Sequence, residues 1–191
     1  LSVSITAEDK ITLQGNIDTA DAANPNILFT GPVEISGDVT VSSDNTTNDG
    51  TIGFSSTIDG AASGTNNLTV LSGSGVPTFS GVIGDGTALN NLSINATDTD
   101  SSNGATAALS IPTIGDSAGS PNAGANVVTI GSTDTASVTF SGDFYRTDGN
   151  FVVTATSAAD KITFNGASTT VTTSGDLVDL NSGVKLGNIN T

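Results

Sequence analysis

The chain has 191 residues, a formal net charge of −15 and no Cys, His, Met or Trp. These features exclude a disulfide framework and any metal site built on thiolate or imidazole ligands. The excess of 19 acidic over 4 basic residues argues against partners that carry phosphate, namely nucleic acids and anionic membrane surfaces.

The apolar residues occur in short alternating clusters of Val, Ile, Leu and Phe rather than in long runs. Alternation with a period of two is typical of β-strands, and no window shows the apolar stripe of an amphipathic helix. Turn-forming dipeptides such as Asp59-Gly60 and Asp148-Gly149 separate the clusters. The sequence therefore predicts an all-β chain with no helix of note.

An internal repeat organises these clusters. The stretch Phe54–Leu71 recurs as Phe79–Thr97, and aligning Phe54 with Phe79 also places Ile58 on Ile83, a step of 25 residues. A self-similar period of this size indicates a repeat architecture in which each unit stacks on its neighbour.

The repeat is built around an anchor residue, a Phe or Leu that follows an apolar residue by two positions and usually precedes a Gly by two. We expect that Gly to mark a bend, because glycine inside a strand weakens it. In chain order, the predicted anchor residues are Leu13, Phe29, Phe54, Phe79, Phe140, Phe164 and Leu186.

The interval between Phe79 and Phe140 is 61 residues long and has room for about two more turns of the repeat. We expect Leu109–Ile111 and Val128–Ile130 to be degenerate copies of the anchor strand, with irregular turns or an insertion around residues 98–126.

A second short strand follows most anchor strands. These second strands are Val39–Val41, Leu68–Val70, Leu92–Ile94, Phe151–Val153 and Leu177–Leu180. Stacking them brings the pair Asn66-Asn67 over Asn90-Asn91, so we expect side-chain hydrogen bonds between neighbouring copies.

A parallel β-helix, or β-solenoid, explains the like residues at a fixed period better than a β-sandwich does, because only stacking places equivalent residues on one another. We therefore predict one β-solenoid domain over residues 1–191, with turns of roughly 20–25 residues. Four rings should point inward, those of Phe54, Phe79, Phe140 and Phe164, and Ile58 and Ile83 should be buried.

We expect each of the two ends of the sequence to interrupt a turn. We expect Leu1–Ile5 to be a second strand with no anchor strand before it, and Val184–Leu186 to be an anchor strand with no second strand after it. Because open solenoid ends expose unpaired edges, we expect more β-coil to cover both, either as further repeats or as head-to-tail copies.

Blocks such as FSGVIGDGTALNNLSINAT (79–97) and ADKITFNGASTTVTTSGDLVDL (159–180) resemble the β-strand repeats of bacterial surface and secreted proteins. These include filamentous-haemagglutinin-like adhesins and autotransporter passengers. The resemblance implies a right-handed parallel β-helix, export and a place on the cell surface. It implies no catalytic residues.

No catalytic constellation is evident, and we expect no enzyme activity. Enzymatic β-helices need clustered acids with a basic residue on one face. We expect Lys10 and Lys161 to occupy the same repeat position, which suggests a scaffold role. Arg146 lies between Asp143 and Asp148, which predicts a surface ion pair.

Two Asx-rich windows are candidate Ca²⁺ sites, because Ca²⁺ takes oxygen ligands and the windows end in a Gly. The candidate ligands are Asp44, Asn48 and Asp49 in the first window and Asp98 and Asp100 in the second. Neither window matches an EF-hand loop, and ordinary Asx turns look the same. We expect no cofactor, with Ca²⁺ as the possible exception.

The sequence favours a non-catalytic structural module of an extracellular bacterial fibre or adhesin. One alternative is a self-assembling head-to-tail filament, sheath or surface-layer subunit, and a lower one is a carbohydrate-binding or carbohydrate-active β-helix. The expected partners are adjoining repeats or copies of the chain end to end, and a host or surface glycan, with no membrane insertion.

Overall fold

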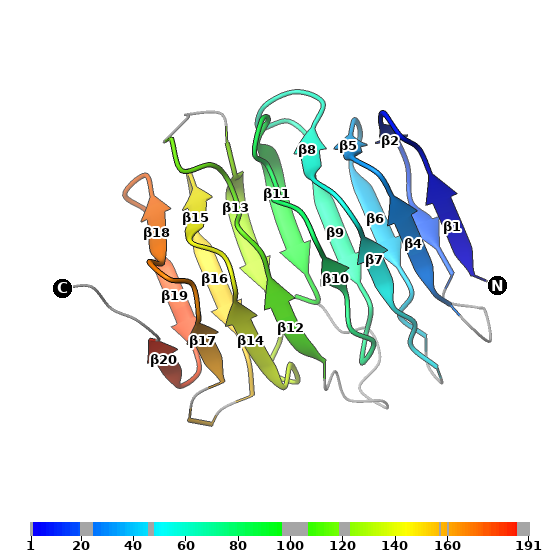
Figure 1. Cartoon of the computed structure of the whole chain (residues 1–191). Helices are drawn as coiled ribbons and strands as arrows, with labels where there is room; N and C mark the ends of the chain where they lie inside the picture. The colour runs from blue at the N-terminus through cyan, green and yellow to red at the C-terminus, as the bar shows by residue number, and fades with distance from the viewer. Residues whose placement is uncertain are drawn as a thin grey trace.

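The computed structural model describes residues 2–19, 25–45, 48–96, 107–118, 123–156, 158–159 and 161–186. Within these ranges the chain forms strands, turns and irregular segments and no helix, as predicted. Parallel strands stack into a β-solenoid whose successive coils lie roughly 25 residues apart in the sequence (Figure 1). In Figure 1 the first coil lies at the right and the last at the left.

One face, here called the anchor face, carries one strand from each coil. Its strands are β1 (Val3–Thr6), β4 (Ile27–Thr30), β7 (Ile52–Phe54) and β10 (Thr78–Phe79), followed by β12 (Ala108–Ile111), β14 (Ser137–Phe140), β17 (Ile162–Phe164) and β20 (Val184–Leu186). They form two four-stranded parallel sheets that follow each other along the solenoid. The three strands β4, β12 and β14 alternate strictly between buried and more exposed positions, as one apolar face requires.

A second face, here called the second-strand face, is formed by the strands that the sequence predicted to follow the anchors. Its members are β3 (Ile17–Asp18), β6 (Val39–Ser42), β9 (Leu68–Leu71), β11 (Leu89–Ile94), β13 (Ala125–Ile130), β16 (Phe151–Thr154) and β19 (Val178–Asn181). Their register matches like with like, since Val41 pairs with Val70 and Val70 with Ile94.

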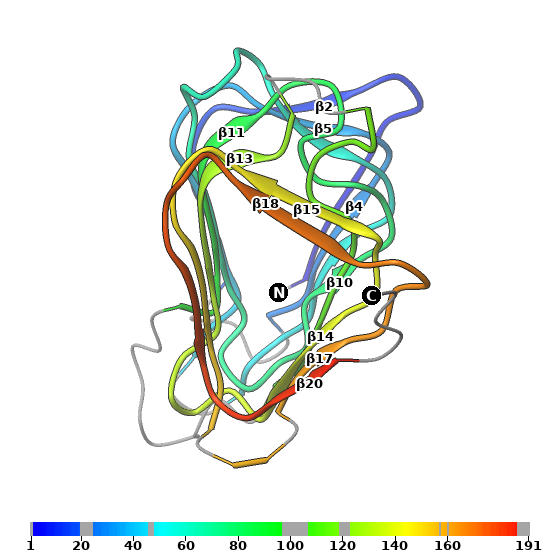
Figure 2. The ribbon, with the colours of Figure 1, turned by 90° about the vertical axis from the view of Figure 1, so that its left-hand side faces the viewer.

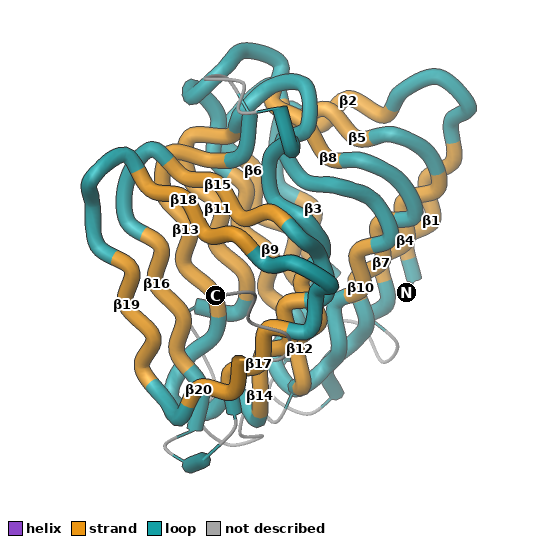
Figure 3. Tube along the Cα trace, turned by 60° about the vertical axis from the view of Figure 1, so that its left-hand side comes forward, coloured by secondary structure: helices purple, strands orange, loops and turns teal. Residues whose placement is uncertain are grey.

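A third face closes the coil between the other two. It contains β2 (Ile11–Leu13), β5 (Val33–Ile35), β8 (Ile58–Gly60), β15 (Phe144–Thr147) and β18 (Thr170–Thr173). Between β8 and β15 the third face continues as isolated parallel bridges. Ile58 of β8 pairs with Ile83, Ile83 pairs with Ile114, and Ile114 pairs with Tyr145 of β15. The view along the solenoid in Figure 2 shows the superposed coils around one central core, and Figure 3 shows the successive strands of each face.

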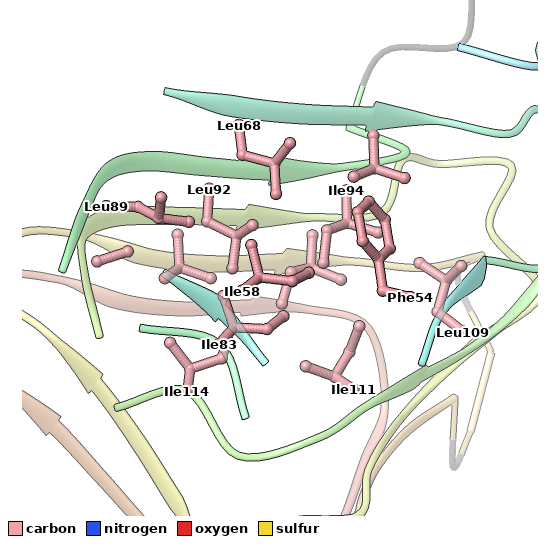
Figure 4. Packing of buried hydrophobic residues seen from close by; sticks show 14 of the residues in the cluster. Phe54, Ile58, Leu68, Ile83, Leu89, Leu92, Ile94, Leu109, Ile111 and Ile114 are labelled. Carbon is pink, nitrogen blue, oxygen red and sulfur yellow. The ribbon is translucent and has the colours of Figure 1, made fainter. Parts of the chain in front are cut away.

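The core is a continuous column of stacked side chains. Phe29 stacks on Phe54 with ring centroids 4.8 Å apart, and Phe54 stacks on Phe79 at 5.5 Å. Farther along, Phe140 stacks on Phe164 at 4.7 Å. Ile58 and Ile83 are buried beside this column, together with Leu68, Leu92 and Ile94 from the second-strand face (Figure 4).

The prediction of inward rings is therefore confirmed, with one difference of degree. Phe54, Phe140 and Phe164 are buried, whereas Phe79 is only partly buried and packs against the edge of the core.

The predicted register of the first coil is wrong. Ile5 pairs with Phe29, so β1 is the first anchor strand and not a second strand. Leu13 pairs with Ile35 on the third face, so it is not an anchor residue. The expectation that the sequence starts with a second strand that lacks its anchor strand is therefore wrong. At the other end, Leu186 pairs with Phe164 as an anchor residue, as predicted.

The described residues between Phe79 and Phe140 contain one further anchor strand rather than two. Leu109–Ile111 lies in β12 and pairs with β14, which confirms it as a copy of the anchor strand. Val128–Ile130 lies in β13 and pairs with β11 and β16, so it belongs to the second-strand face.

The Gly after the anchor has a specific structural role. A Cβ atom added at Gly31, which has a φ of 125°, would overlap the backbone carbonyl oxygen of Ala7 in the preceding coil. Gly81 and Gly142 meet the backbone of the coil below them in the same way. The bend expected from the sequence is thus a corner where two coils approach too closely for a side chain.

Candidate functional site

The first candidate Ca²⁺ window lies in the loop between β6 and β7. Asp44 is buried, Asp49 is half-buried and Asn48 is exposed. Both carboxylates approach Gly73 in the next coil, because a Cβ atom built there would be 2.8 Å from Oδ1 of Asp44 and 2.6 Å from Oδ2 of Asp49.

Hydrogen bonds from the chain itself reach both oxygens of Asp49. The Asn45 N–H donates to Oδ1 at 2.8 Å, and the N–H and hydroxyl of Ser74 donate to Oδ2 at 2.7 and 2.6 Å. Asp49 therefore links its own loop, through Asn45, to the turn at Ser74 in the next coil. This role needs no metal ion.

Asp98 and Asp100, the ligands of the second window, lie outside the described residues. Within the described ranges, no group of three or more His, Cys, Asp or Glu side chains is placed to hold a metal ion. The same described residues contain no helix long and apolar enough to cross a bilayer.

The predicted Asn stacking is confirmed and extends over several coils. Oδ1 of Asn67 accepts hydrogen bonds from the amide side chains of Asn90 and Asn91, at 2.9 and 2.8 Å, and from the Asn91 backbone N–H at 3.1 Å. The side chain of Asn126 then donates to Oδ1 of Asn90 at 3.1 Å. These contacts join the turns that lead into the second-strand face.

A buried polar column at the next corner was not predicted from the sequence. Ser43, Ser72 and Asn95 each follow a second strand and are buried. Oδ1 of Asn95 accepts a hydrogen bond from the Ser72 N–H at 2.8 Å, and its amide group donates to the Gly73 carbonyl at 3.2 Å. Asn95 has a φ of 47°, a conformation that Asn tolerates better than most residues. The available signal was the polar residue that directly follows each of these strands.

Tyr145 occupies the position that Ile58, Ile83 and Ile114 hold in earlier coils. Its hydroxyl accepts a hydrogen bond from the Gly142 N–H at 2.7 Å and lies 3.2 Å from the Ile111 carbonyl oxygen, to which it can donate. Burial raises the pKa of Tyr145 above its ordinary value of 10.0. The phenol thus fills the core and satisfies backbone groups at a corner.

The basic residues are dispersed over the molecule. Lys10 binds Glu34 of the next coil at 2.7 Å on the third face. Lys161 directly precedes β17 on the anchor face, so the predicted equivalence of Lys10 and Lys161 is wrong. Arg146 lies in β15, and its predicted pairing with Asp143 or Asp148 stays a prediction.

Comparisons of the chain with protein-family models, with curated proteins and with solved structures returned no match. The fold alone therefore defines the class of protein, a β-repeat protein that forms a parallel β-solenoid.

Proposed function

We propose that the chain is a non-catalytic structural module, a stiff β-solenoid segment of an extracellular bacterial surface fibre or adhesin. The observation that carries this proposal is the continuous core column, in which each ring or aliphatic side chain stacks on its counterpart in the next coil. Hydrogen bonds between coils, such as those of Asn67, add to it at the turns.

This construction suits a load-bearing segment. Backbone pairing joins the second and third coils on all three faces, so displacing one from the other requires breaking three parallel ladders at once. The resemblance to repeats of bacterial surface proteins supports a place outside the cell.

Surface labelling tests the proposed location. Antibodies raised against the purified chain should label intact cells of the source organism, and electron microscopy of the purified chain should show short rods. Labelling that appears only after the cells are permeabilised would contradict the extracellular role, and globular particles would contradict the rod.

Self-assembly into a filament is the second candidate. The last described coil leaves four large apolar side chains exposed, those of Leu177, Val178, Val184 and Leu186. Exposed apolar surface next to unpaired strand edges favours association with another β-coil. Fibres in the same micrographs would select this candidate, and discrete rods at high protein concentration would exclude it.

A further inference from the structure

The anchor face differs in charge from the rest of the molecule. Its eight strands contain no Asp or Glu, although the chain has 19 acidic residues, and Lys185 is the single charged residue within them. Strands of the other two faces do carry acids, with Asp18 in β3, Glu34 in β5, Asp59 in β8 and Asp179 in β19.

Hydroxyl groups dominate the outward positions of the first four anchor strands. Exposed Ser or Thr residues recur in pairs two positions apart. These pairs are Ser4 with Thr6 in the first coil and Thr78 with Ser80 in the fourth, and the coils between them contribute Thr30 and Ser55.

The register places these residues on a regular grid. Ser4, Leu28, Gly53 and Thr78 lie opposite one another on successive strands, and Thr6 lies opposite Thr30. Neighbouring rows are about 4.8 Å apart, and outward residues along one strand are about 6.7 Å apart.

The grid is also partly apolar. The exposed side chain of Leu28 lies across Gly53, because a Cβ atom at position 53 would be 2.9 Å from Cδ1 of Leu28. Val76, which precedes β10, is exposed as well. The surface thus combines hydroxyl donors and acceptors with a low aliphatic ridge.

We propose that this part of the anchor face, formed by β1, β4, β7 and β10, binds an uncharged polysaccharide in an extended conformation. A neutral sugar polymer offers hydroxyl groups for the Ser and Thr side chains and C–H faces for Leu28. The charge distribution favours this occupant. An anionic polymer would be repelled by a molecule of net charge −15, and a cationic one would be drawn to the acidic strands of the other faces.

This proposed binding surface is one face of the solenoid, and its binding does not depend on the compartment in which the protein resides. It is tested by depletion from solution with two insoluble neutral polysaccharides, microcrystalline cellulose and starch granules. The wild-type chain should bind at least one of them, and because no ion pair contributes, binding should be unchanged at about 0.5 M salt.

The informative variant is Thr30→Asp combined with Thr78→Asp, which places two carboxylates on the grid two coils apart. Binding should fall about tenfold or more, because each carboxylate would have to lose water against a neutral ligand. The matched control is Thr40→Asp combined with Ser93→Asp, which places the same two charges two coils apart on the second-strand face. It should bind like the wild type, and thermal melts by circular dichroism verify that both variants fold.

Three outcomes would overturn the proposal. The first is a wild-type chain that neither polysaccharide retains, and the second is equal binding by the two double variants. The third is a wild-type dimer in sedimentation that only Thr30→Asp/Thr78→Asp disrupts, which would assign the face to a second copy of the chain instead.

Discussion

Phe54 offers the sharpest test of the stacked core, because it contacts a ring on either side. Its ring centroid lies 4.8 Å from that of Phe29 and 5.5 Å from that of Phe79, and the side chain is 1% exposed. Truncating a buried Phe to Ala costs about 3–5 kcal/mol, and an aromatic pair contributes about 0.5–1.5 kcal/mol beyond its buried area. With two such pairs lost, we expect Phe54→Ala to lower the free energy of unfolding by about 5 kcal/mol.

Phe79→Ala is the matched comparison. Phe79 stacks on Phe54 but is only partly buried, so less apolar surface is lost on truncation. We expect a cost of about 2–3 kcal/mol, below the range for fully buried rings. Phe54→Leu, which keeps most of the volume and loses both stacks, should cost about 1–2 kcal/mol.

Urea titration measures these differences, with far-ultraviolet circular dichroism and the fluorescence of Tyr145, the single Tyr in a chain without Trp. At a slope of about 2 kcal/mol per molar urea, Phe54→Ala should move the midpoint by about 2.5 M. The reasoning fails if Phe79→Ala costs as much as Phe54→Ala, since the cost would then not follow burial and stacking.

Three further predictions concern polar groups. Tyr145→Phe should cost about 1–3 kcal/mol, because the Gly142 N–H loses its acceptor inside the corner. Because burial raises the pKa of Tyr145 above 10.0, the stability gained from the neutral phenol is complete below pH 10 and lost as the pH rises further. Alkaline denaturation should therefore be steeper for the wild type than for Tyr145→Phe, and identical pH profiles would contradict this. Asn67→Ala should cost about 0.5–1.5 kcal/mol in the same titration, because the hydrogen bond to the exposed Asn91 N–H is lost to water, whereas Asn67→Asp keeps an acceptor and should cost less. Chelator should leave the melting temperature unchanged, because Asp49 is held by donors of the chain, and a drop of about ten degrees would show a bound metal instead.

The fold was predictable where the repeat is regular. Phe54 and Phe79 have the same neighbours at the same distances in sequence, so one alignment placed both rings and both isoleucines correctly. The Asn stacking followed from the same alignment, because stacked coils bring equal residues together.

The first coil was misassigned for a physical reason. Ile5 holds the place of an anchor Phe, and six positions separate it from Ile11, whereas four separate Phe29 from Val33. A corner loop can gain two residues without disturbing the core, since only the inward positions must stay in register. The anchor motif therefore matches at Leu13, which precedes Gly15 by two positions but lies on the third face.

The candidate site was less accessible from the sequence. The charge-free grid around Leu28 depends on which residues of four separate coils point outward together, and that requires the register of β1, β4, β7 and β10. The hydrogen-bonding role of Asp49 could not be predicted for the same reason, because its partner Ser74 lies in the next coil.

The pairing of each coil with its immediate neighbours also shapes how the chain acquires its structure. Paired residues are separated by as few as 22 positions, as for Ile11 and Val33, and by no more than the 36 between Leu92 and Val128. None of these pairs joins the two far ends of the sequence. Each folded coil can therefore act as a template on which the next segment of the chain pairs. A chain threaded through a narrow channel would therefore fold progressively on the far side, and each added coil would oppose its return.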